Sequence, residues 1–434
     1  MIEIKRLKEL EENELNNLFH RFGDDFTSIM TDTVIPIVND VKKNGDNAVK
    51  KYTEKYDSVK LKNIQVTEKE IDLAYKNIPK EIINAFNLAK NNIEEFHLHQ
   101  IKNNIIYTRD DETTLGVIYQ PIEYAAIYTP GGKATYPSSI LMGVIPALIA
   151  GVKNISIITP PNKEGKISDI ILATCKIVGI ERIYKIGGAQ GIAAVGFGTE
   201  SINKADIIVG PGNIYVTAAK TYLFSLGLIQ IDSMAGPSEI LIIADETANP
   251  NWIACDLLSQ AEHEEMAIPL LVTTSEELAI KVKKHIITDI ESNTGRHSIK
   301  KKAISDNGLI LLVDSIEEAI SFSNRFSPEH MELMILNPLE YLFKIKNVGS
   351  LFLGPYSPVA IGDYFSGTNH ILPTGGASRF SSGLSVDTFT RRTSFQLLTK
   401  VSLERAKGPV NIMSKIEGFE DKHGGSVNIR FKKE

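Results

Sequence analysis

The chain is poor in cysteine and tryptophan. Only two cysteines, Cys175 and Cys255, occur in 434 residues, which excludes a disulfide framework and a zinc site built from thiolates. A reducing, cytoplasmic setting is therefore expected. We interpret Cys255 as a buried structural thiol rather than a nucleophile, because it lies in the apolar, helical run 252–258.

The chain also lacks long apolar runs and a strong charge of either sign. Its most apolar stretch, 143–152, is too short to span a bilayer and contains Pro146, and the first residues lack the apolar stretch of a signal peptide. The formal charge of -6 is spread along the chain, so we expect neither a nucleic-acid nor a membrane partner. Hydrophobic content of 43% and charged content of 23% are typical of a globular protein with a large core.

Two sets of short β-rich runs alternate with helical patterns and predict parallel sheets covered by helices. Before them, the pattern predicts helix in 1–26, several helices in 27–100, and strand and turn in 105–123. The first set predicts strands 125–129, 155–159, 183–186 and 206–209, with helices 139–150, 167–178 and 189–196 between them. The second set predicts strands 240–244, 269–273, 309–313, 331–334 and 350–353, with helix 250–263. The tail from 389 predicts a helix and then a short strand at 426–430.

These patterns predict an α/β fold of two Rossmann-like domains. Both have an incomplete, mostly parallel sheet, and small helical extensions lie at the two ends of the chain. The expected division is 1–26 for an N-terminal helical arm, 27–124 with 236–384 for one domain, 125–235 for the other, and 385–434 for a C-terminal tail. The glycine- and serine-rich stretch 366–385 predicts a long loop, which is either functional or disordered.

Glu329 and His330 place a carboxylate beside an imidazole, which offers an acid/base pair. Ser327 and Pro328 predict the cap and first residue of a helical turn. The alternative is an ordinary surface pair, because function has to be argued from a whole site.

Three further patterns could supply metal ligands. Gln260 and His263 lie three residues apart on a predicted helix and share a face, although a solvated helix end is the simpler interpretation. Asp363 is expected in a loop after a strand, as a metal carboxylate or as a turn residue. His423 stands in Lys-His-Gly-Gly near the chain end, and nothing local identifies it as a ligand.

Two glycine loops, 187–191 and 210–213, follow predicted strands of the first set. Ligands of open α/β sheets bind at the carboxyl ends of strands, and glycine lets the backbone approach a phosphate. The standard Gly-x-Gly-x-x-Gly dinucleotide motif is absent, so either loop alone is a weak signal.

Taken together and in this order, the motifs resemble the histidinol dehydrogenase family over nearly the whole chain. The residues that carry the resemblance are Tyr128-Thr-Pro-Gly-Gly-Lys-Ala-Thr-Tyr-Pro-Ser-Ser, Ile186-Gly-Gly-Ala-Gln-Gly-Ile-Ala-Ala-Val-Gly, Val209-Gly-Pro-Gly-Asn-Ile-Tyr-Val, Ala235-Gly-Pro-Ser-Glu, Ser259-Gln-Ala-Glu-His, Ser327-Pro-Glu-His, Gly362-Asp-Tyr and Gly367-Thr-Asn-His-Ile-Leu-Pro-Thr.

The resemblance implies a zinc-dependent enzyme that oxidises L-histidinol through bound histidinaldehyde to L-histidine with two NAD, the last steps of histidine biosynthesis. His330 would be the general base on the alcohol, and Glu329 would activate the water that attacks the aldehyde. The implied ligands of one zinc ion per subunit are Gln260, His263, Asp363 and His423. The implied substrate contacts are Ser238, His370 and Glu417 together with Gln260, His263, His330, Asp363 and His423, and the implied NAD contacts are Tyr128, Gln190 and Asn213.

The resemblance also implies a homodimer in which the C-terminal zinc histidine crosses the interface. One departure affects this region, because Glu417-Gly-Phe-Glu-Asp-Lys places one residue more before His423 than the family pattern has. Either the turn carries an insertion or Glu417 is displaced, with Glu420 as a weaker substitute.

Two other classes of function stay open. In a zinc hydrolase, the same ligands would hold a hydrolytic water with Glu329 as base, but the glycine loops would have no role. A non-catalytic ligand-binding relative on the same scaffold would bind histidinol without turnover.

Overall fold

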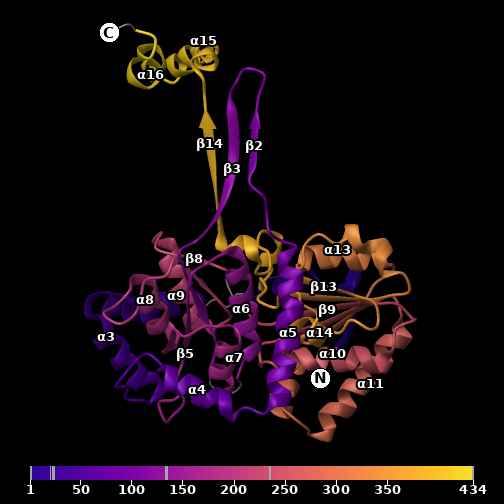
Figure 1. Cartoon of the computed structure of the whole chain (residues 1–434). Helices are drawn as coiled ribbons and strands as arrows, with labels where there is room; N and C mark the ends of the chain where they lie inside the picture. Colours follow the sequence, from indigo (N-terminus) through magenta and orange to yellow (C-terminus); the bar gives the residue numbers. More distant parts are fainter. Residues whose placement is uncertain (1, 20, 22–24, 132–134, 234–235, 433–434) are drawn as a thin grey trace. The chain divides into compact units, whose positions relative to one another are not determined.

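The computed structural model describes residues 2–19, 21, 25–131, 135–233 and 236–432, and its contacts divide the chain into two compact units. The larger unit consists of Met1–Gln100 and Ile122–Phe389, and the smaller consists of Ile101–Pro121 and Thr390–Glu434. The larger unit contains two parallel sheets with helices on both faces (Figure 1). The α/β class with mostly parallel sheets is thereby confirmed.

The six-stranded sheet has the order β1-β11-β10-β9-β12-β13, and all its neighbouring strands are parallel. Alternate residues of a strand point to opposite faces, so Ile240 and Ile242 pack against one helical layer and Leu241 and Ile243 against the other. Helices α10, α11 and α12 form the first layer, and α13 with α1 forms the second. The strands are β1 Glu3–Arg6, β9 Glu239–Ala244, β10 Ile268–Thr273, β11 Leu309–Leu312, β12 His330–Met334 and β13 Ser350–Leu353. The helices around this sheet are α1 Glu12–Phe19, α10 Pro250–Ala261, α11 Glu276–Ser292, α12 His297–Asp306, α13 Ile316–Phe326 and α14 Val359–Tyr364.

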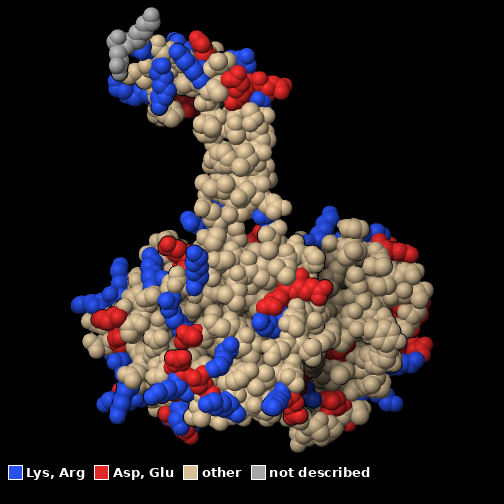
Figure 2. Space-filling model, viewed as in Figure 1, with Lys and Arg blue, Asp and Glu red and all other residues tan. Residues whose placement is uncertain are grey.

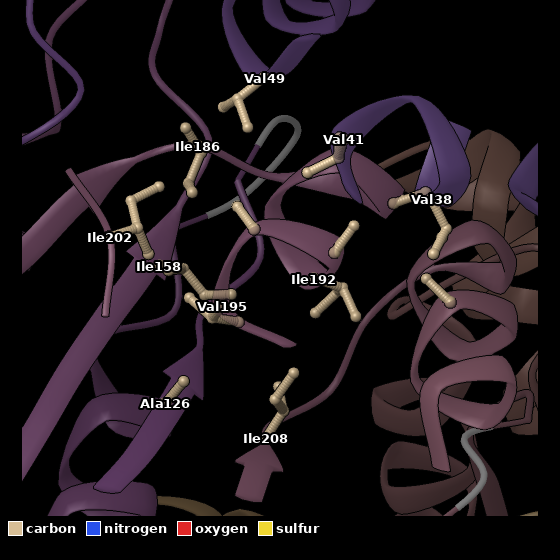
Figure 3. Packing of buried hydrophobic residues seen from close by; sticks show 14 of the residues in the cluster. Val38, Val41, Val49, Ala126, Ile158, Ile186, Ile192, Val195, Ile202 and Ile208 are labelled. Carbon is tan, nitrogen blue, oxygen red and sulfur yellow. The ribbon is translucent and has the colours of Figure 1, made fainter. Parts of the chain in front are cut away.

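The five-stranded sheet has the order β6-β5-β4-β7-β8 and is also parallel. Helices α3, α8 and α9 bury valine, isoleucine and alanine side chains on one face, and Figure 3 shows Ile192 and Val195 of α8 between Val38 and Val41 of α3 and Ile158 and Ile208 of the strands. Helices α5, α6 and α7 cover the other face. The elements are β4 Tyr124–Tyr128, β5 Asn154–Thr159, β6 Ile183–Lys185, β7 Ile207–Val209, β8 Gln230–Ile231, α2 Asp25–Ser28, α3 Ile35–Asp57, α4 Glu68–Asn77, α5 Lys80–Leu98, α6 Pro137–Ala150, α7 Asp169–Ile177, α8 Gly188–Phe197 and α9 Ile214–Ser225.

The remaining turns of the larger unit are short. They are the 3-10 turns η1 Leu7–Glu9, η3 Pro338–Lys344, η4 Ala377–Arg379 and η5 Val386–Phe389, and the π-helical turn η2 Ile29–Val34. No helix in the described residues is both long enough and apolar enough to cross a membrane. Figure 2 shows basic and acidic side chains interspersed on the visible face of this unit, as a chain of spread charge predicts.

The smaller unit is an antiparallel three-stranded sheet followed by helices. Its order is β14-β3-β2, with β2 Ile105–Thr108, β3 Thr114–Pro121 and β14 Thr390–Leu397. Thr399 begins α15 Lys400–Ile416 with a capping box, in which its hydroxyl accepts the Ser402 N–H and the Ser402 hydroxyl accepts the Thr399 N–H. The chain then forms the π-helical turn η6 Glu420–Gly424 and α16 Gly425–Ile429.

The structure confirms all nine strands predicted in the two sets, with bounds that agree to within a residue or two. The expectation of helix from the first residue is wrong at Glu3–Arg6, which pairs with β11 at the edge of the six-stranded sheet. The predicted strand at 426–430 is also wrong, since α16 occupies that sequence, and β14 was missed. Cys175 is buried as a structural thiol, but Cys255 is exposed on α10, so its predicted burial is wrong.

Candidate active site

A cavity of about 340 Å³ lies within the larger unit and is lined by residues from both parallel sheets. Gly210, Pro211, Gly212 and Asn213 come from the carboxyl end of β7, whereas Glu329 and His330 come from the amino end of β12. Of the residues predicted for the site, eight line this cavity: Asn213, Ser238, Gln260, His263, Glu329, His330, Asp363 and His370. Motifs that are up to 160 residues apart along the chain are therefore brought to one place.

The Glu329-His330 pair enters a strand and not the helical turn expected from Ser327-Pro328. Ser327 ends α13 in the left-handed conformation, with φ of 54°, and Pro328 then directs the chain into β12. The strand pairing begins at once, since the Ser350 N–H donates to the Glu329 carbonyl at 2.8 Å. Ser327 was predicted to begin a helical turn as its N-cap. It instead ends α13 as a left-handed residue, and the sequence alone does not distinguish these two roles of serine.

Burial and one hydrogen bond define the state of His330. Its Nδ1 lies 3.1 Å from the Glu239 backbone carbonyl, which can only accept, so Nδ1 carries the proton and Nε2 carries the lone pair. Nε2 is buried, has no hydrogen-bond partner in the described residues and lies 3.9 Å from Asp363 Oδ1. Burial lowers the pKa of His330, which favours the neutral imidazole. A basic nitrogen thus lies at the cavity wall.

A backbone N–H binds the Glu329 carboxylate. Its Oε2 accepts the Glu239 N–H at 2.9 Å and lies 3.5 Å from His330 Nδ1. Burial raises the pKa of Glu329 well above its ordinary value, and the nearby carboxylates of Glu239, Asp363 and Glu264 act in the same direction. Once deprotonated, this carboxylate is a stronger base than one on the surface.

Glu239 connects the pair to the rest of the site, and sequence reasoning assigned it no role. Its Oε2 accepts the Glu329 N–H at 3.2 Å and its Oε1 accepts the Gly375 N–H at 3.0 Å. Arg21 Nη1 lies 2.8 Å from Oε2, and both side chains are almost completely buried. Burial raises the pKa of Glu239 to about 7, although the Arg21 guanidinium opposes this shift. The only sequence feature that pointed to Glu239 was its place directly after Ser238 in the Ala235-Gly-Pro-Ser-Glu motif. No motif pointed to Arg21.

Three predicted zinc ligands line the cavity on separate elements. Gln260 is buried in the last turn of α10, and His263 follows the end of that helix, so the two remain one turn apart as predicted. Asp363 lies on the short helix α14 and not in a loop, which corrects that expectation. His370 faces Asp363, with Nδ1 2.9 Å from the Asp363 carbonyl and burial lowering the pKa of its ring.

Ser238 is held by a carboxylate that sequence reasoning also missed. Its backbone N–H and its hydroxyl both donate to Glu264 Oε1, at 3.0 and 3.3 Å, and Glu264 lines the cavity. Glu264 follows directly after the Ser259-Gln-Ala-Glu-His motif, so its place beside a metal-ligand candidate was its only signal.

The predicted NAD contacts divide into two groups. Asn213 lines the cavity and caps α9 by accepting the N–H groups of Tyr215 and Val216. Tyr128 and Gln190 are buried and do not line the cavity; both meet the Gly188 turn, where the Tyr128 hydroxyl accepts the Gly188 N–H at 3.5 Å. Burial raises the pKa of Tyr128 to about 12, so its hydroxyl stays protonated.

His423 and Glu417 belong to the smaller unit. Both are exposed, with Glu417 at the C-cap of α15 and His423 within the π-helical turn η6. Such a turn closes i→i+5 and holds one residue more than an α turn. In the described residues, no three His, Cys, Asp or Glu side chains cluster as a metal site, so the proposed ligand set depends on the Gln260 amide. Residues 132–134 and Ala235 of the quoted motifs lie outside the described residues.

Comparison with known proteins gives one consistent family. The family model described as histidinol dehydrogenase matches residues 21–431. The chain is 48% identical over 417 residues to the histidinol dehydrogenase of Leptospira biflexa, covering 96% of each chain, and 45% identical to that of Clostridium acetobutylicum, covering 97% of this chain and 96% of the relative. The crystal structure of histidinol dehydrogenase from Elizabethkingia anophelis superimposes with a TM-score of 0.91 at 40% identity, covering 99% of this chain and 97% of that one.

The fold and these matches define the class of the protein, which is an NAD-dependent oxidoreductase of histidine biosynthesis. The particular family follows from the coverage of almost the whole chain. The chain belongs to the histidinol dehydrogenase family.

Proposed function

We propose that the protein oxidises L-histidinol to L-histidine in two steps at the cavity, through bound histidinaldehyde. The observation that carries the proposal is His330 Nε2, a buried imidazole nitrogen with no hydrogen-bond partner among the described residues. Its lone pair is fixed by the hydrogen bond from Nδ1 to the Glu239 carbonyl. A neutral imidazole with a lowered pKa is suited to accept the alcohol proton.

His330 and Glu329 would divide the two oxidations between them. In the first step, His330 Nε2 takes the hydroxyl proton of histidinol while the carbon loses a hydride. In the second, Glu329 takes a proton from the water that adds to the aldehyde carbon. The resulting hydrate anion would lose the second hydride to give the carboxylic acid, which releases its proton to solvent and becomes the carboxylate. Glu329 and His330 line the same cavity, so one bound substrate can serve both groups.

The residues present fit the two cofactors of the family. For zinc, an imidazole, a carboxylate and an amide oxygen from His263, Asp363 and Gln260 line one cavity, and His423 would complete the set; a bound zinc ion would orient the imidazole and amine of the substrate. For NAD, the glycine loops at Gly188 and Gly210 lie at carboxyl ends of parallel strands, as a dinucleotide requires. Bound NAD would take up the hydride in each step.

Other parts of the proposal concern the organisation of the protein. Residues 125–235 would hold NAD through Tyr128, Gln190 and Asn213, and 27–124 with 236–384 would hold substrate through Ser238 and His370. Residues 385–434 would form the dimerisation tail and bring His423 and Glu417 to the partner's cavity. The cytoplasmic setting stays a prediction from the cysteine content.

The direct test is incubation of the zinc-loaded protein with L-histidinol and NAD, followed by NADH absorbance. We expect NADH to form, and we expect His330→Asn to lower the rate by on the order of 10²-fold or more, because it lacks a general base. No NADH from the wild-type protein would favour the zinc hydrolase or the binding relative. Near-normal rates in the variant would remove His330 from the role of base.

A further inference from the structure

A buried ion pair lies directly behind the glycine loop that lines the cavity. Lys220, on α9, has only 3% of its side chain exposed, and its Nζ forms an ion pair with Asp232 Oδ1. Asp232 follows β8 and itself lines the cavity. Taking two charges out of water is costly, and apolar residues of similar volume often replace such a pair without loss of stability. A charged pair at this place therefore calls for an explanation beyond stability.

Both partners bind the backbone of the same residue, Gly210. Lys220 Nζ donates to the Gly210 carbonyl at 3.1 Å, and the Gly210 N–H donates to Asp232 Oδ2 at 2.7 Å. The peptide groups before and after Gly210 are thus each bound by a charged side chain. Hydrogen bonds to charged groups are stronger than those between neutral groups. The pair fixes the orientation of both peptide planes.

Gly210 needs such support because its conformation is unusual. Its φ of +113° is open to glycine and strained for other residues, and a Cβ at this position would overlap the Tyr128 carbonyl oxygen. It follows the last residue of β7, where regular strand pairing has ended. From this point the chain runs through Pro211 and Gly212 to Asn213, and all four residues line the cavity.

The pair also joins two parts of the cavity wall that come from different segments. The Gly210–Asn213 loop carries a proposed NAD contact, whereas Asp232 lies six residues before Ser238, a proposed substrate contact. Lys220 contacts neither the cavity nor a substrate group, since it is absent from the cavity lining. Its influence would therefore act through the backbone of Gly210.

We propose that Lys220 and Asp232 are positioning residues that hold the Gly210–Asn213 loop in the conformation that binds NAD. The proposal rests on the proposed function, in which this loop contacts NAD through Asn213. It deepens that function by assigning cofactor affinity to a buried ion pair that touches the cofactor only through the loop.

The test is NADH binding to the zinc-loaded protein, followed by NADH fluorescence at equilibrium. Lys220→Met keeps the length of the side chain and removes the donor to the Gly210 carbonyl, so the Kd for NADH should rise on the order of ten-fold, the effect of losing one charge-assisted hydrogen bond. The KM for L-histidinol and the zinc content should stay within about two-fold of the wild type, because the proposed function gives this loop a contact with NAD and none with L-histidinol or zinc. An unchanged Kd for NADH would overturn the proposal, as would equal losses for NADH and L-histidinol.

Two further variants separate positioning from folding. The double variant Lys220→Met with Asp232→Asn has no unpaired charge and keeps an acceptor for the Gly210 N–H, so it should fold even if the single variant does not, and its Kd for NADH should still be raised. Normal NADH affinity in the double variant would contradict the proposal. Lys300→Met is the control, because Lys300 is also a buried lysine in an ion pair: it lies on α12, 2.6 Å from Asp289 of α11, whose side chain is 37% exposed. It should leave NADH binding unchanged.

Asn213→Ala distinguishes failure of this inference from failure of the proposed function. If Asn213→Ala weakens NADH binding and Lys220→Met does not, the loop binds NAD without help from the ion pair, and only the inference fails. If neither variant changes NADH binding, the placement of NAD at this loop fails and the inference fails with it.

Discussion

At the scale of single residues, backbone groups of Glu239 hold the adjacent side chains of Glu329 and His330. The Glu239 carbonyl fixes the tautomer of His330, and the Glu239 N–H binds the carboxylate of Glu329. The Glu239 carboxylate in turn accepts a hydrogen bond from the Glu329 N–H. Two neighbours in sequence thereby present one basic nitrogen and one carboxylate, each held by strand β9 and each able to accept a proton.

Glu329→Gln should separate the two oxidations. Glutamine keeps an acceptor for the Glu239 N–H but cannot take a proton from water, so oxidation of supplied histidinaldehyde should fall by about 10²-fold or more while alcohol oxidation changes only a few-fold. Rapid kinetics with each substrate measure the two steps. Glu340→Gln, an exposed change on η3, is the control. Equal losses in both steps would argue against a role for Glu329 in activating water.

At the scale of elements, the site joins the carboxyl ends of strands in one sheet to the amino ends of strands in the other. The glycine loops after β6 and β7 agree with the usual rule for open α/β sheets. Ser238, Glu239 and the Glu329-His330 pair lie instead at the starts of β9 and β12. The strands themselves were predictable, because buried parallel strands are continuous apolar runs.

The elements that were mispredicted share a physical cause. Glu3–Arg6 is polar and alternates poorly, and it becomes a strand because the edge of β11 offers it backbone hydrogen bonds. Thr390–Leu397 is a strand because β3 pairs with it from 269 to 283 residues away. Asp363 was expected in a loop because helix α14 has only six residues, too few to show a helical period in the sequence. Site residues were found through motifs, whereas Arg21 and Glu239 act through contacts that no local pattern records.

Glu332, on the same strand as His330, predicts a pH dependence of stability. Its carboxyl group is buried, and its Oε1 accepts the Val359 N–H at 3.0 Å. Burial raises the pKa of Glu332 above its ordinary value of 4.5, and the neighbouring Asp256 carboxyl acts in the same direction. The folded protein then binds a proton that the unfolded chain has released, so stability falls as pH rises above about 4.5 towards the folded pKa.

Glu332→Gln removes this proton linkage and keeps an acceptor for Val359. Its melting temperature should therefore exceed that of the wild type at pH 9, with a smaller difference at pH 5, by roughly 1 °C for each kcal/mol gained in a chain of 434 residues. Thermal unfolding at both pH values checks this, with Glu340→Gln as the exposed control. A melting temperature that falls equally with pH in both proteins would contradict the role of Glu332.

At the scale of the whole molecule, the smaller unit has features that a partner would satisfy. Its exposed apolar side chains include Ile106, Tyr107, Ile412, Ile416 and Phe419. Figure 2 shows mostly uncharged surface along its strands. Such patches mark interaction sites. This agrees with the proposal that the tail forms a homodimer and carries a zinc ligand to the other subunit.

His423→Asn should weaken zinc retention if His423 completes the zinc site. Loss of a direct ligand should cost more than the roughly 10–100-fold in affinity that loss of an outer-shell partner costs. Zinc content after dialysis measures this, with His285→Asn, an exposed histidine on α11, as the control. Unchanged zinc content in the His423 variant would remove His423 from the site.

The central claim is that one cavity completes two consecutive oxidations, and the NADH formed per molecule of L-histidinol tests it most directly. With limiting L-histidinol, excess NAD and zinc-loaded protein, the account predicts two NADH for each L-histidinol consumed and L-histidine as the product. One NADH for each L-histidinol, with histidinaldehyde released, would contradict it.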